Sequence, residues 1–384
     1  MKMKTPRQSK TMVVRGPGRD MLQTVQAARG VAAGLVVLCH AGTILGSPVY
    51  LNYVPFLGIF RFGHAGVDFF FVLSGFIIST VHRNDIGRPG VIRSYAWKRL
   101  VRIYPIYWLV AGGAIALATF GLPPDPDFTF GAIPARNLVF SLLLLPQHPV
   151  LGVAWTLAHE MLFYLIFGLA IVNRPIGLIA FCLWTALTVT NVLSSPPDLT
   201  PWAPADLWFG FIGSSYHLQF LLGIAVAVGV RRFPLPRPRL FVLAGIAGLG
   251  GAAWLENTGR ILYIGYASQA LFGLFSAMTL TGLVAGERRG QLRASRLAVF
   301  LGAASYSVYL VHVPAMAAWA AWAALLTGGG INILPGWLLM LALAAAAVAL
   351  GSVIHMAAER PLLRLLHRQV SPLPNGAPVR LGSH

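Results

Sequence analysis

The chain has 384 residues, of which 57% are hydrophobic and only 10% are charged. A soluble domain carries about 25% charged residues, so this composition excludes a large soluble core and indicates a protein that crosses a membrane several times. The formal net charge of +18 would suggest a nucleic-acid partner in a soluble protein, but the placement of the charges along the chain argues against nucleic acid here.

Apolar windows of about twenty residues predict ten membrane-spanning helices and an all-α, polytopic helical bundle. An even number of spans places both ends of the chain on the same side of the membrane. The predicted spans are 26–46, 64–82, 103–121, 152–173, 176–193, 212–230, 240–256, 261–285, 298–320 and 334–357.

The placement of the basic residues indicates on which side of the membrane the two termini lie. All but three of the 29 Lys and Arg residues fall at the termini and in alternate loops, the exceptions being Arg61, Arg136 and Arg260. Loops rich in Lys and Arg stay in the cytoplasm, so both termini are predicted to be cytoplasmic. A bacterial inner membrane, with its lipids as partners, is the natural setting.

The same pattern divides the chain into three parts. Residues 1–25 are expected to form a cytoplasmic tail, 26–361 the transmembrane domain and 362–384 a second cytoplasmic tail. Residues 1–20 lack the apolar core of a cleaved signal peptide, so the first span is expected to be retained. The apolar segment 137–146 is too short to cross and is interpreted as re-entrant or interfacial.

The first span contains an arginine and a histidine on one helix face. Arg29 and His40 are eleven residues apart, close to a whole number of turns and about 16 Å along the axis. Ionisable residues at membrane depth are costly and suggest function, and imidazole suits proton transfer near neutral pH. The alternative is a juxtamembrane arginine that only follows the positive-inside rule and a histidine that is hydrogen-bonded in the core of the bundle.

The second span begins with GHAGVDFFFVLSGFIIS, residues 63–79. Asp68 lies near its outer end, with Ser74 and Gly75 deeper. This carboxylate would orient an imidazole or bind an acceptor hydroxyl, or it would simply be solvated at the interface.

The third span opens with two arginines on one face, Arg99 and Arg102. Paired guanidinium groups suit phosphate recognition, although anionic lipid headgroups would be bound equally well. Tyr104, Tyr107 and Trp108 follow and are typical of an interfacial aromatic belt.

Another acidic residue lies in WTLAHEMLFYLIF, residues 155–167. Glu160 and Tyr164 share a face one turn apart, whereas His159 points away from them. A buried carboxylate needs a partner, so Glu160 is expected to face the interior, where it bonds a substrate or ties helices together.

Near the end of the chain, Ser305, Tyr309 and His312 follow the spacing of one helix face. A polar stripe on a helix rich in Ala and Val suggests a cavity lining, with helix packing as the alternative. Glu359-Arg360-Pro361 is most simply a helix end. Cys39 and Cys182 both lie in apolar runs, and neither a disulfide framework nor a metal motif is indicated.

Taken in order, these segments resemble the acyltransferase-3 family of integral-membrane O-acyltransferases, particularly members that acetylate bacterial exopolysaccharides. The matching pieces cover residues 25–361 and read VQAARGVAAGLVVLCH, GHAGVDFFFVLSGFI, KRLVRIYPIYW, VAWTLAHEMLFY, SYSVYLVH and ERP. One departure is Ala27-Ala28, where relatives often carry an Asp-Gly or similar pair.

The resemblance implies an acyl-CoA donor, usually acetyl-CoA, and a sugar hydroxyl of a polysaccharide or its lipid-linked precursor as the acceptor. It assigns the essential arginine and histidine to Arg29 and His40, the Arg-x-x-Arg pair to Arg99 and Arg102, and the family glutamate to Glu160. On this hypothesis the arginines bind the donor phosphates, and His40 acts as general base or transient acyl acceptor. Glu160 or Asp68 would steer its imidazole.

Two alternatives remain at this stage. A transporter or flippase for glycans would also need polar residues at the midplane, although paired broken helices are not evident. An acyltransferase acting on a small molecule or a lipid would share all these motifs. Its acceptor contacts would lie in the loops 47–63, 121–150 and 194–213.

Overall fold

The computed structural model describes residues 22–47, 52–120, 135–146, 149–194, 207–326 and 335–368. In these segments the chain forms helices and turns, without a β-strand. The α-helices are α1 Gln23–Gly46, α2 Ala65–His82, α3 Ile92–Thr119, α4 Ala135–Leu142, α5 Trp155–Val172, α6 Arg174–Ser194, α7 Leu207–Ile212, α8 His217–Arg232, α9 Pro238–Asn257, α10 Tyr266–Arg288, α11 Arg296–Leu326, α12 Gly336–Ile354 and α13 Arg360–Arg368. Short 3-10 helices cover Pro55–His64, Pro89–Val91 and Gly152–Ala154, and His355–Glu359 is π-helical.

Ten helical segments of the described chain are long and apolar enough to cross a membrane. They follow the ten predicted spans in order, so the prediction of a polytopic all-α membrane protein is confirmed. Their length satisfies the roughly twenty residues that a bilayer requires. The cytoplasmic placement of the termini and the three-part division of the chain stay predictions, and most of both tails lies outside the described residues.

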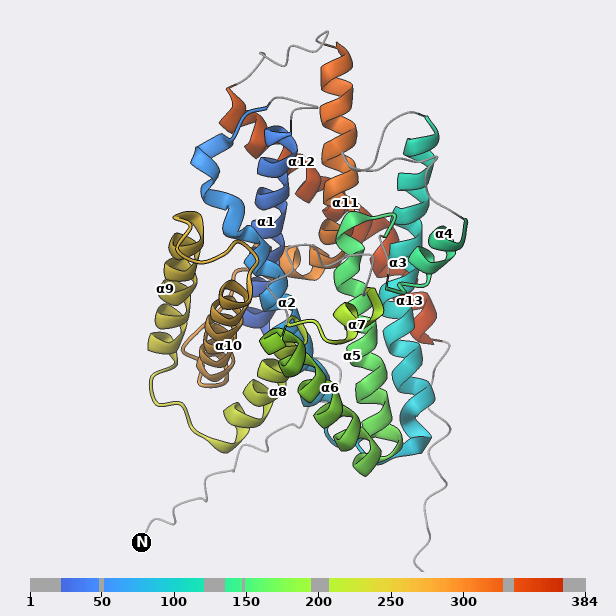
Figure 1. Cartoon of the computed structure of the whole chain (residues 1–384), viewed down its shortest axis with the longest axis vertical. Helices are drawn as coiled ribbons and strands as arrows, with labels where there is room; N and C mark the ends of the chain where they lie inside the picture. The colour runs from blue at the N-terminus through green and yellow to red at the C-terminus, as the bar shows by residue number, and fades with distance from the viewer. Residues whose placement is uncertain are drawn as a thin grey trace, which may run out of the picture.

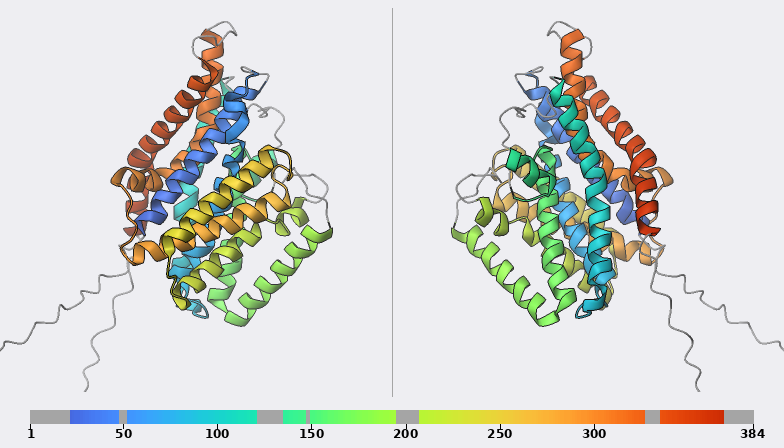
Figure 2. Two further views of the ribbon diagram at one scale, coloured as in Figure 1. Left: turned by 90° about the vertical axis from the view of Figure 1, so that its left-hand side faces the viewer. Right: turned by 90° about the vertical axis from the view of Figure 1, so that its right-hand side faces the viewer.

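The helices pack as one bundle in which α9 and α10 lie together at one edge and α3 and α13 at the opposite edge (Figure 1). The two largest interior contacts join α1 to α11 and α2 to α8. Figure 2 shows α5 and α6 as a hairpin and α11 beside α12. Helices distant in sequence therefore meet in the centre, where the polar residues are.

Two glycines set how closely the central helices approach. A Cβ atom on Gly302 of α11 would lie 1.7 Å from the carbonyl oxygen of Gln26 on α1, and one on Gly223 of α8 would lie 2.0 Å from that of Val72 on α2. Only glycine permits such contacts, as is common where membrane helices cross. The α1–α11 crossing matters for the site because α1 carries Arg29 and His40, and α11 carries Ser305, Tyr309 and His312.

The segment predicted as re-entrant or interfacial contains the eight-residue helix α4, which is too short to span. Its last carbonyl groups accept hydrogen bonds from the predicted aromatic belt of α3: Tyr107 donates to Ser141, Trp108 to Leu142 and Tyr104 to Leu143, at 2.8–2.9 Å. These bonds satisfy carbonyls that a helix end leaves without partners.

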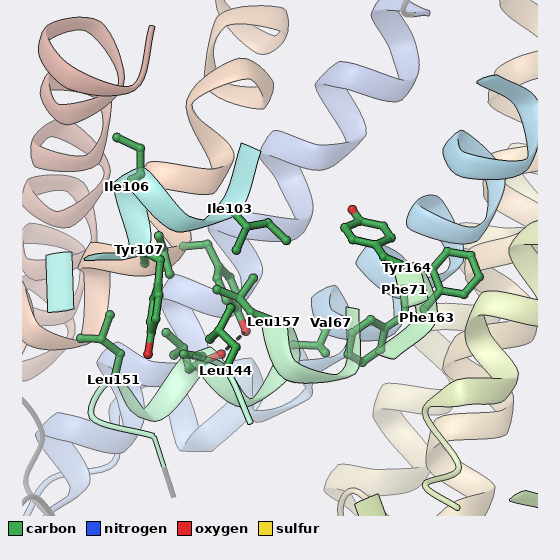
Figure 3. Close-up of a cluster of buried hydrophobic side chains, with 14 of the residues drawn as sticks. Val67, Phe71, Ile103, Ile106, Tyr107, Leu144, Leu151, Leu157, Phe163 and Tyr164 are labelled. Carbon is green, nitrogen blue, oxygen red and sulfur yellow. Dashed lines mark hydrogen bonds between the residues drawn. The ribbon is translucent and has the colours of Figure 1, made fainter. Parts of the chain in front are cut away.

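The main apolar core fills the space between α2, α3 and α5. Figure 3 shows its residues, with Val67 of α2, Ile103 of α3 and Leu157 of α5 converging from three helices. The same three side chains also line the central cavity, so the core forms one wall of the candidate site.

Candidate active site

A cavity of about 530 Å³ lies between α1, α2, α3, α5 and α11, within the usual size range of small-molecule sites. Its lining on α2 runs from Val67 to Val81, which corresponds to about 20 Å of helix. We call the part lined by Gln26, Arg29, Arg99 and Arg102 the arginine end. We call the part lined by Val67, Phe70, Thr156 and Tyr309 the aromatic end.

The arginine end brings together all three arginines that the sequence singled out, and it adds Lys98. Arg29 donates a 3.1 Å hydrogen bond to Gln26 of its own helix. The start of that helix is fixed because the carboxylate of Glu287 accepts hydrogen bonds from the backbone N–H groups of Gln23 and Thr24, both at 2.7 Å. A negative charge at a helix N-terminus is favourable, so this contact holds α1 and thereby Arg29 in place.

Arg99 and Arg102 sit over aromatic rings. The guanidinium carbon of Arg99 is 5.6 Å from the ring centroid of Tyr164, and that of Arg102 is 5.0 Å from Tyr306. The buried Nε of Arg99 has no hydrogen-bond partner among the described residues. A buried donor without an acceptor is costly, and an anionic ligand in the cavity would satisfy it.

Glu160 faces the cavity, as predicted, and Tyr164 lies beside it. Its Oε1 accepts a 2.9 Å hydrogen bond from Ser74 and a short one from Tyr164. The carboxylate therefore connects α5 to α2 in the middle of the cavity. His159, on the other side of α5, pairs with His217 at 2.8 Å and is absent from the lining.

Glu359 has a more important place in the structure than the helix end that the sequence indicates. This side chain is fully buried and forms an ion pair with Arg102. It also accepts hydrogen bonds from Ser307 at 2.7 Å and from His355 at 2.8 Å. Two ionisable residues four apart in an otherwise apolar span were the signal that could have identified the pair of His355 and Glu359.

His40 meets His312 across the α1–α11 contact, with ring centroids 4.9 Å apart. The His40 Nδ1 lies 2.9 Å from the carbonyl oxygen of Val36 and 3.2 Å from Nε2 of His312. Because a carbonyl only accepts, Nδ1 of His40 carries a proton, and in the neutral ring the lone pair lies at Nε2. The same argument applies to Nδ1 of His312, which donates to Tyr309 O at 2.7 Å, so its Nε2 accepts from His40.

The predicted stripe on α11 is divided between the cavity and the histidine pair. Ser305 and Tyr309 line the cavity, whereas His312 is buried behind Tyr309, with ring centroids 5.8 Å apart. The hydroxyl of Ser305 is buried without a hydrogen-bond partner in the described part of the chain. The stripe therefore connects the two parts of the site.

Asp68 is the one proposed site residue that lies apart from both. It is fully buried, and its Oδ1 accepts a 2.9 Å hydrogen bond from Gln219 of α8. It does not contribute to the cavity lining. Val36 and His312 both contact the His40 ring, and Glu160 binds Ser74 and Tyr164. The expectation that Glu160 or Asp68 steers the imidazole has no support in these contacts.

The chain matches the sequence model of the family Acyl_transf_3, described as an acyltransferase domain, over residues 23–356. The protein therefore belongs to the acyltransferase-3 family, and it is an integral membrane O-acyltransferase. This class excludes the transporter alternative as the main interpretation.

Two relatives illustrate the range of the family. The chain is 31% identical to the exopolysaccharide production protein ExoZ of Rhizobium meliloti (strain 1021) over 321 residues, which cover 79% of this chain and 91% of the relative. It is 26% identical to the acyltransferase MdmB of Streptomyces mycarofaciens over 379 residues, which cover 91% and 93%. No solved structure matches the chain. Among the described residues, no group of three His, Cys, Asp or Glu side chains could hold a metal ion.

Proposed function

We propose that this protein transfers an acyl group, usually acetyl, from acyl-CoA to a hydroxyl of an exported polysaccharide or of its lipid-linked precursor. The observation that carries the proposal is the arrangement of the cavity. Three arginines line one end of it, and Tyr309 at the other end contacts the histidine pair. The arginines suit the phosphates of a CoA donor, and the histidine pair suits proton transfer at the reacting group.

The donor would bind with its phosphates at Arg29, Arg99 and Arg102, supported by Lys98. The Arg102 side chain is 28% exposed although its partner Glu359 is fully covered, so part of this side chain remains open at the cavity. The apolar wall of Leu73 and Ile77 would take the pantetheine arm. This arm is flexible and long enough to cover the roughly 16 Å of helix between Arg29 and His40.

The reaction at His40 balances without a further reactant. Nε2 of His40 removes the proton of the acceptor hydroxyl, and the alkoxide oxygen attacks the thioester carbonyl. The carbon–sulfur bond breaks, and the CoA thiolate takes up the proton from His40. The alternative is that His40 first accepts the acyl group at Nε2 and then passes it to the hydroxyl. His312 would hold the ring in the tautomer that both routes need.

The remaining polar residues would have supporting parts. Glu160 and Tyr164 would position the donor in the middle of the cavity, and the partnerless hydroxyl of Ser305 would bind a polar group of the arm or the acceptor. We assign Asp68 to holding α2 against α8 and not to the reaction.

The polysaccharide acceptor is supported by the relative that is named for exopolysaccharide production. We accordingly expect the protein to work in a bacterial inner membrane beside polysaccharide-biosynthesis machinery. A small-molecule or lipid acceptor is the second candidate. The loops assigned to acceptor binding lie partly outside the described residues, at 48–51, 121–134, 147–148 and 195–206.

The proposal is tested by release of CoA from acetyl-CoA by the protein in nanodiscs. Wild type should release CoA slowly, and faster when a glycan acceptor is supplied. His40→Ala and His40→Gln should both lose this activity by at least about a thousandfold, because neither side chain can act as a base or acyl carrier. Acetyl-CoA binding should persist in both variants.

The arginine end is tested in the same samples. Arg29→Ala should weaken acetyl-CoA binding, whereas Arg289→Ala, which removes an equal charge from an exposed position, should not. Full activity of His40→Gln would refute the assignment of His40. If wild type neither turns over nor binds acetyl-CoA, the proposed function is refuted.

A further inference from the structure

Two aromatic side chains lie together at the aromatic end of the cavity. Phe70 of α2 and Tyr309 of α11 both line the cavity and contact each other edge to face, with ring centroids 5.9 Å apart. His312 lies on the far side of Tyr309, and neither His312 nor His40 belongs to the lining. Tyr309 therefore contacts both the cavity and His312 of the histidine pair.

Tyr309 is held firmly in this position. Its hydroxyl lies 2.9 Å from that of Thr156 and 3.2 Å from the carbonyl oxygen of Val153, both on the segment that begins α5. The side chain is buried and thus contacts protein on nearly all sides. These contacts fix the position of the ring against the start of α5, and close-packed interiors resist added volume.

A donor anchored by its phosphates can only reach a fixed depth. With the phosphates at the arginine end, the length of the pantetheine arm determines where the thioester lies, and the acyl chain extends from that point. Each methylene beyond a short acyl group then has to fit against the rings of Phe70 and Tyr309.

We infer that Phe70 and Tyr309 are specificity-determining residues that limit the transferred group to short acyl chains. The inference rests on the proposed function, since it takes acyl-CoA as the donor. It adds a named substrate class, short-chain acyl-CoA, and the pair of side chains that selects it.

The experiment compares acetyl-, butyryl- and hexanoyl-CoA as donors, with CoA release and acyl-CoA binding measured in nanodiscs. In wild type, kcat/KM should fall by about tenfold or more from acetyl- to hexanoyl-CoA, the usual consequence of methylenes that a pocket cannot take. Phe70→Ala should raise the ratio of hexanoyl to acetyl turnover by about tenfold. Phe70→Leu removes less volume and should shift the ratio in the same direction by less.

Two control variants identify the position that matters. Ile77→Ala trims an apolar side chain of the same cavity wall on the same helix, about 10 Å nearer the arginine end, and should leave the ratio unchanged. Tyr309→Phe keeps the ring and should also preserve the preference for acetyl-CoA, whereas Tyr309→Ala should relax it.

The outcomes separate the two proposals. If wild type turns over acyl-CoA but folded Phe70→Ala and Phe70→Leu keep the wild-type ratio, the inference is overturned and the proposed function stands. The inference also fails if Ile77→Ala shifts the ratio as much as Phe70→Ala does. If wild type neither binds nor cleaves any of the three donors, the proposed function and the inference fall together.

Discussion

Two buried glutamates of this protein have nearly the same surroundings and lie in different places. The side chains of Glu256, at the end of α9, and Glu359, after α12, both have a relative exposure of 0%. Each accepts hydrogen bonds from one histidine and one serine. For Glu256 these are His64 at 2.9 Å and Ser268 at 2.6 Å. For Glu359 they are His355 and Ser307.

The third hydrogen-bond donor to each glutamate distinguishes the two clusters. We call Glu256 and its partners the loop cluster, and Glu359 and its partners the cavity cluster. Glu256 accepts from the backbone N–H of Ile264 at 2.9 Å, in a turn where Ile264 has a φ of 56°. Glu359 binds the guanidinium of Arg102, which lines the cavity together with His355. One carboxylate thus closes a loop with an unfavourable backbone conformation, whereas the other holds a side chain that faces the candidate donor site.

This comparison shows that a buried carboxylate is not in itself a sign of chemistry. Burial requires that the charge be satisfied, and both clusters meet that requirement. What differs is whether one of the partners can also reach a ligand. Tyr263 contacts the ring of His64 edge to face, and burial raises the pKa of its hydroxyl above the ordinary value.

The largest expected effect is on stability and belongs to the loop cluster. Glu256→Ala removes the acceptor of His64, Ser268 and the Ile264 N–H at once, and should destabilise the protein by about 3–5 kcal/mol. Thermal unfolding in nanodiscs should show a lower midpoint. CoA release per folded molecule should stay near the wild-type value. A variant of normal stability that has lost activity would contradict the structural interpretation of this cluster.

The cavity cluster should respond through the donor. Glu359→Gln keeps the shape of the side chain but leaves Arg102 without its counter-charge and without its fixed orientation. The KM for acetyl-CoA should rise by about tenfold, equivalent to about 1.4 kcal/mol of lost binding, with a much smaller change in kcat.

The matched variant is Glu256→Gln, which makes the same chemical change in the loop cluster. CoA should raise the unfolding midpoint of wild type and of Glu256→Gln equally, since ligands stabilise the state that they bind. The increase should be smaller in Glu359→Gln at the same CoA concentration. Equal increases in all three proteins would show that Glu359 does not act on the donor site.

The sequence contains enough information to place helices but not to choose their neighbours. Length and hydropathy identify the ten spans, and helical spacing puts Arg99 beside Arg102 and Glu160 beside Tyr164, as the cavity lining bears out. Contacts between helices follow from packing that no local pattern encodes. Asp68 could not be known to bind Gln219 from the facing helix.

The same limit explains why the sequence does not reveal the interhelical partners of Glu359 and His40. Both contacts cross between helices that are more than 250 residues apart in the chain, with His40 meeting His312 and Arg102 meeting Glu359. The first of these approaches depends on Gly302, which lets the backbones of α1 and α11 come close. Spacing along one helix gives the face that a residue occupies, and only the fold gives what that face meets.

The smallest expected effects come from the two serines, which give the closest matched pair. Ser268→Ala and Ser307→Ala each remove one hydrogen bond to a buried carboxylate, and each should cost about 1–2 kcal/mol of stability. Only Ser307→Ala should also raise the KM for acetyl-CoA, by about twofold to threefold, because a looser Glu359 holds Arg102 less firmly. The loop cluster contributes no side chain to the cavity lining. If Ser268→Ala changed the donor KM by the same amount, both clusters would therefore act on the cavity through the general stability of the bundle.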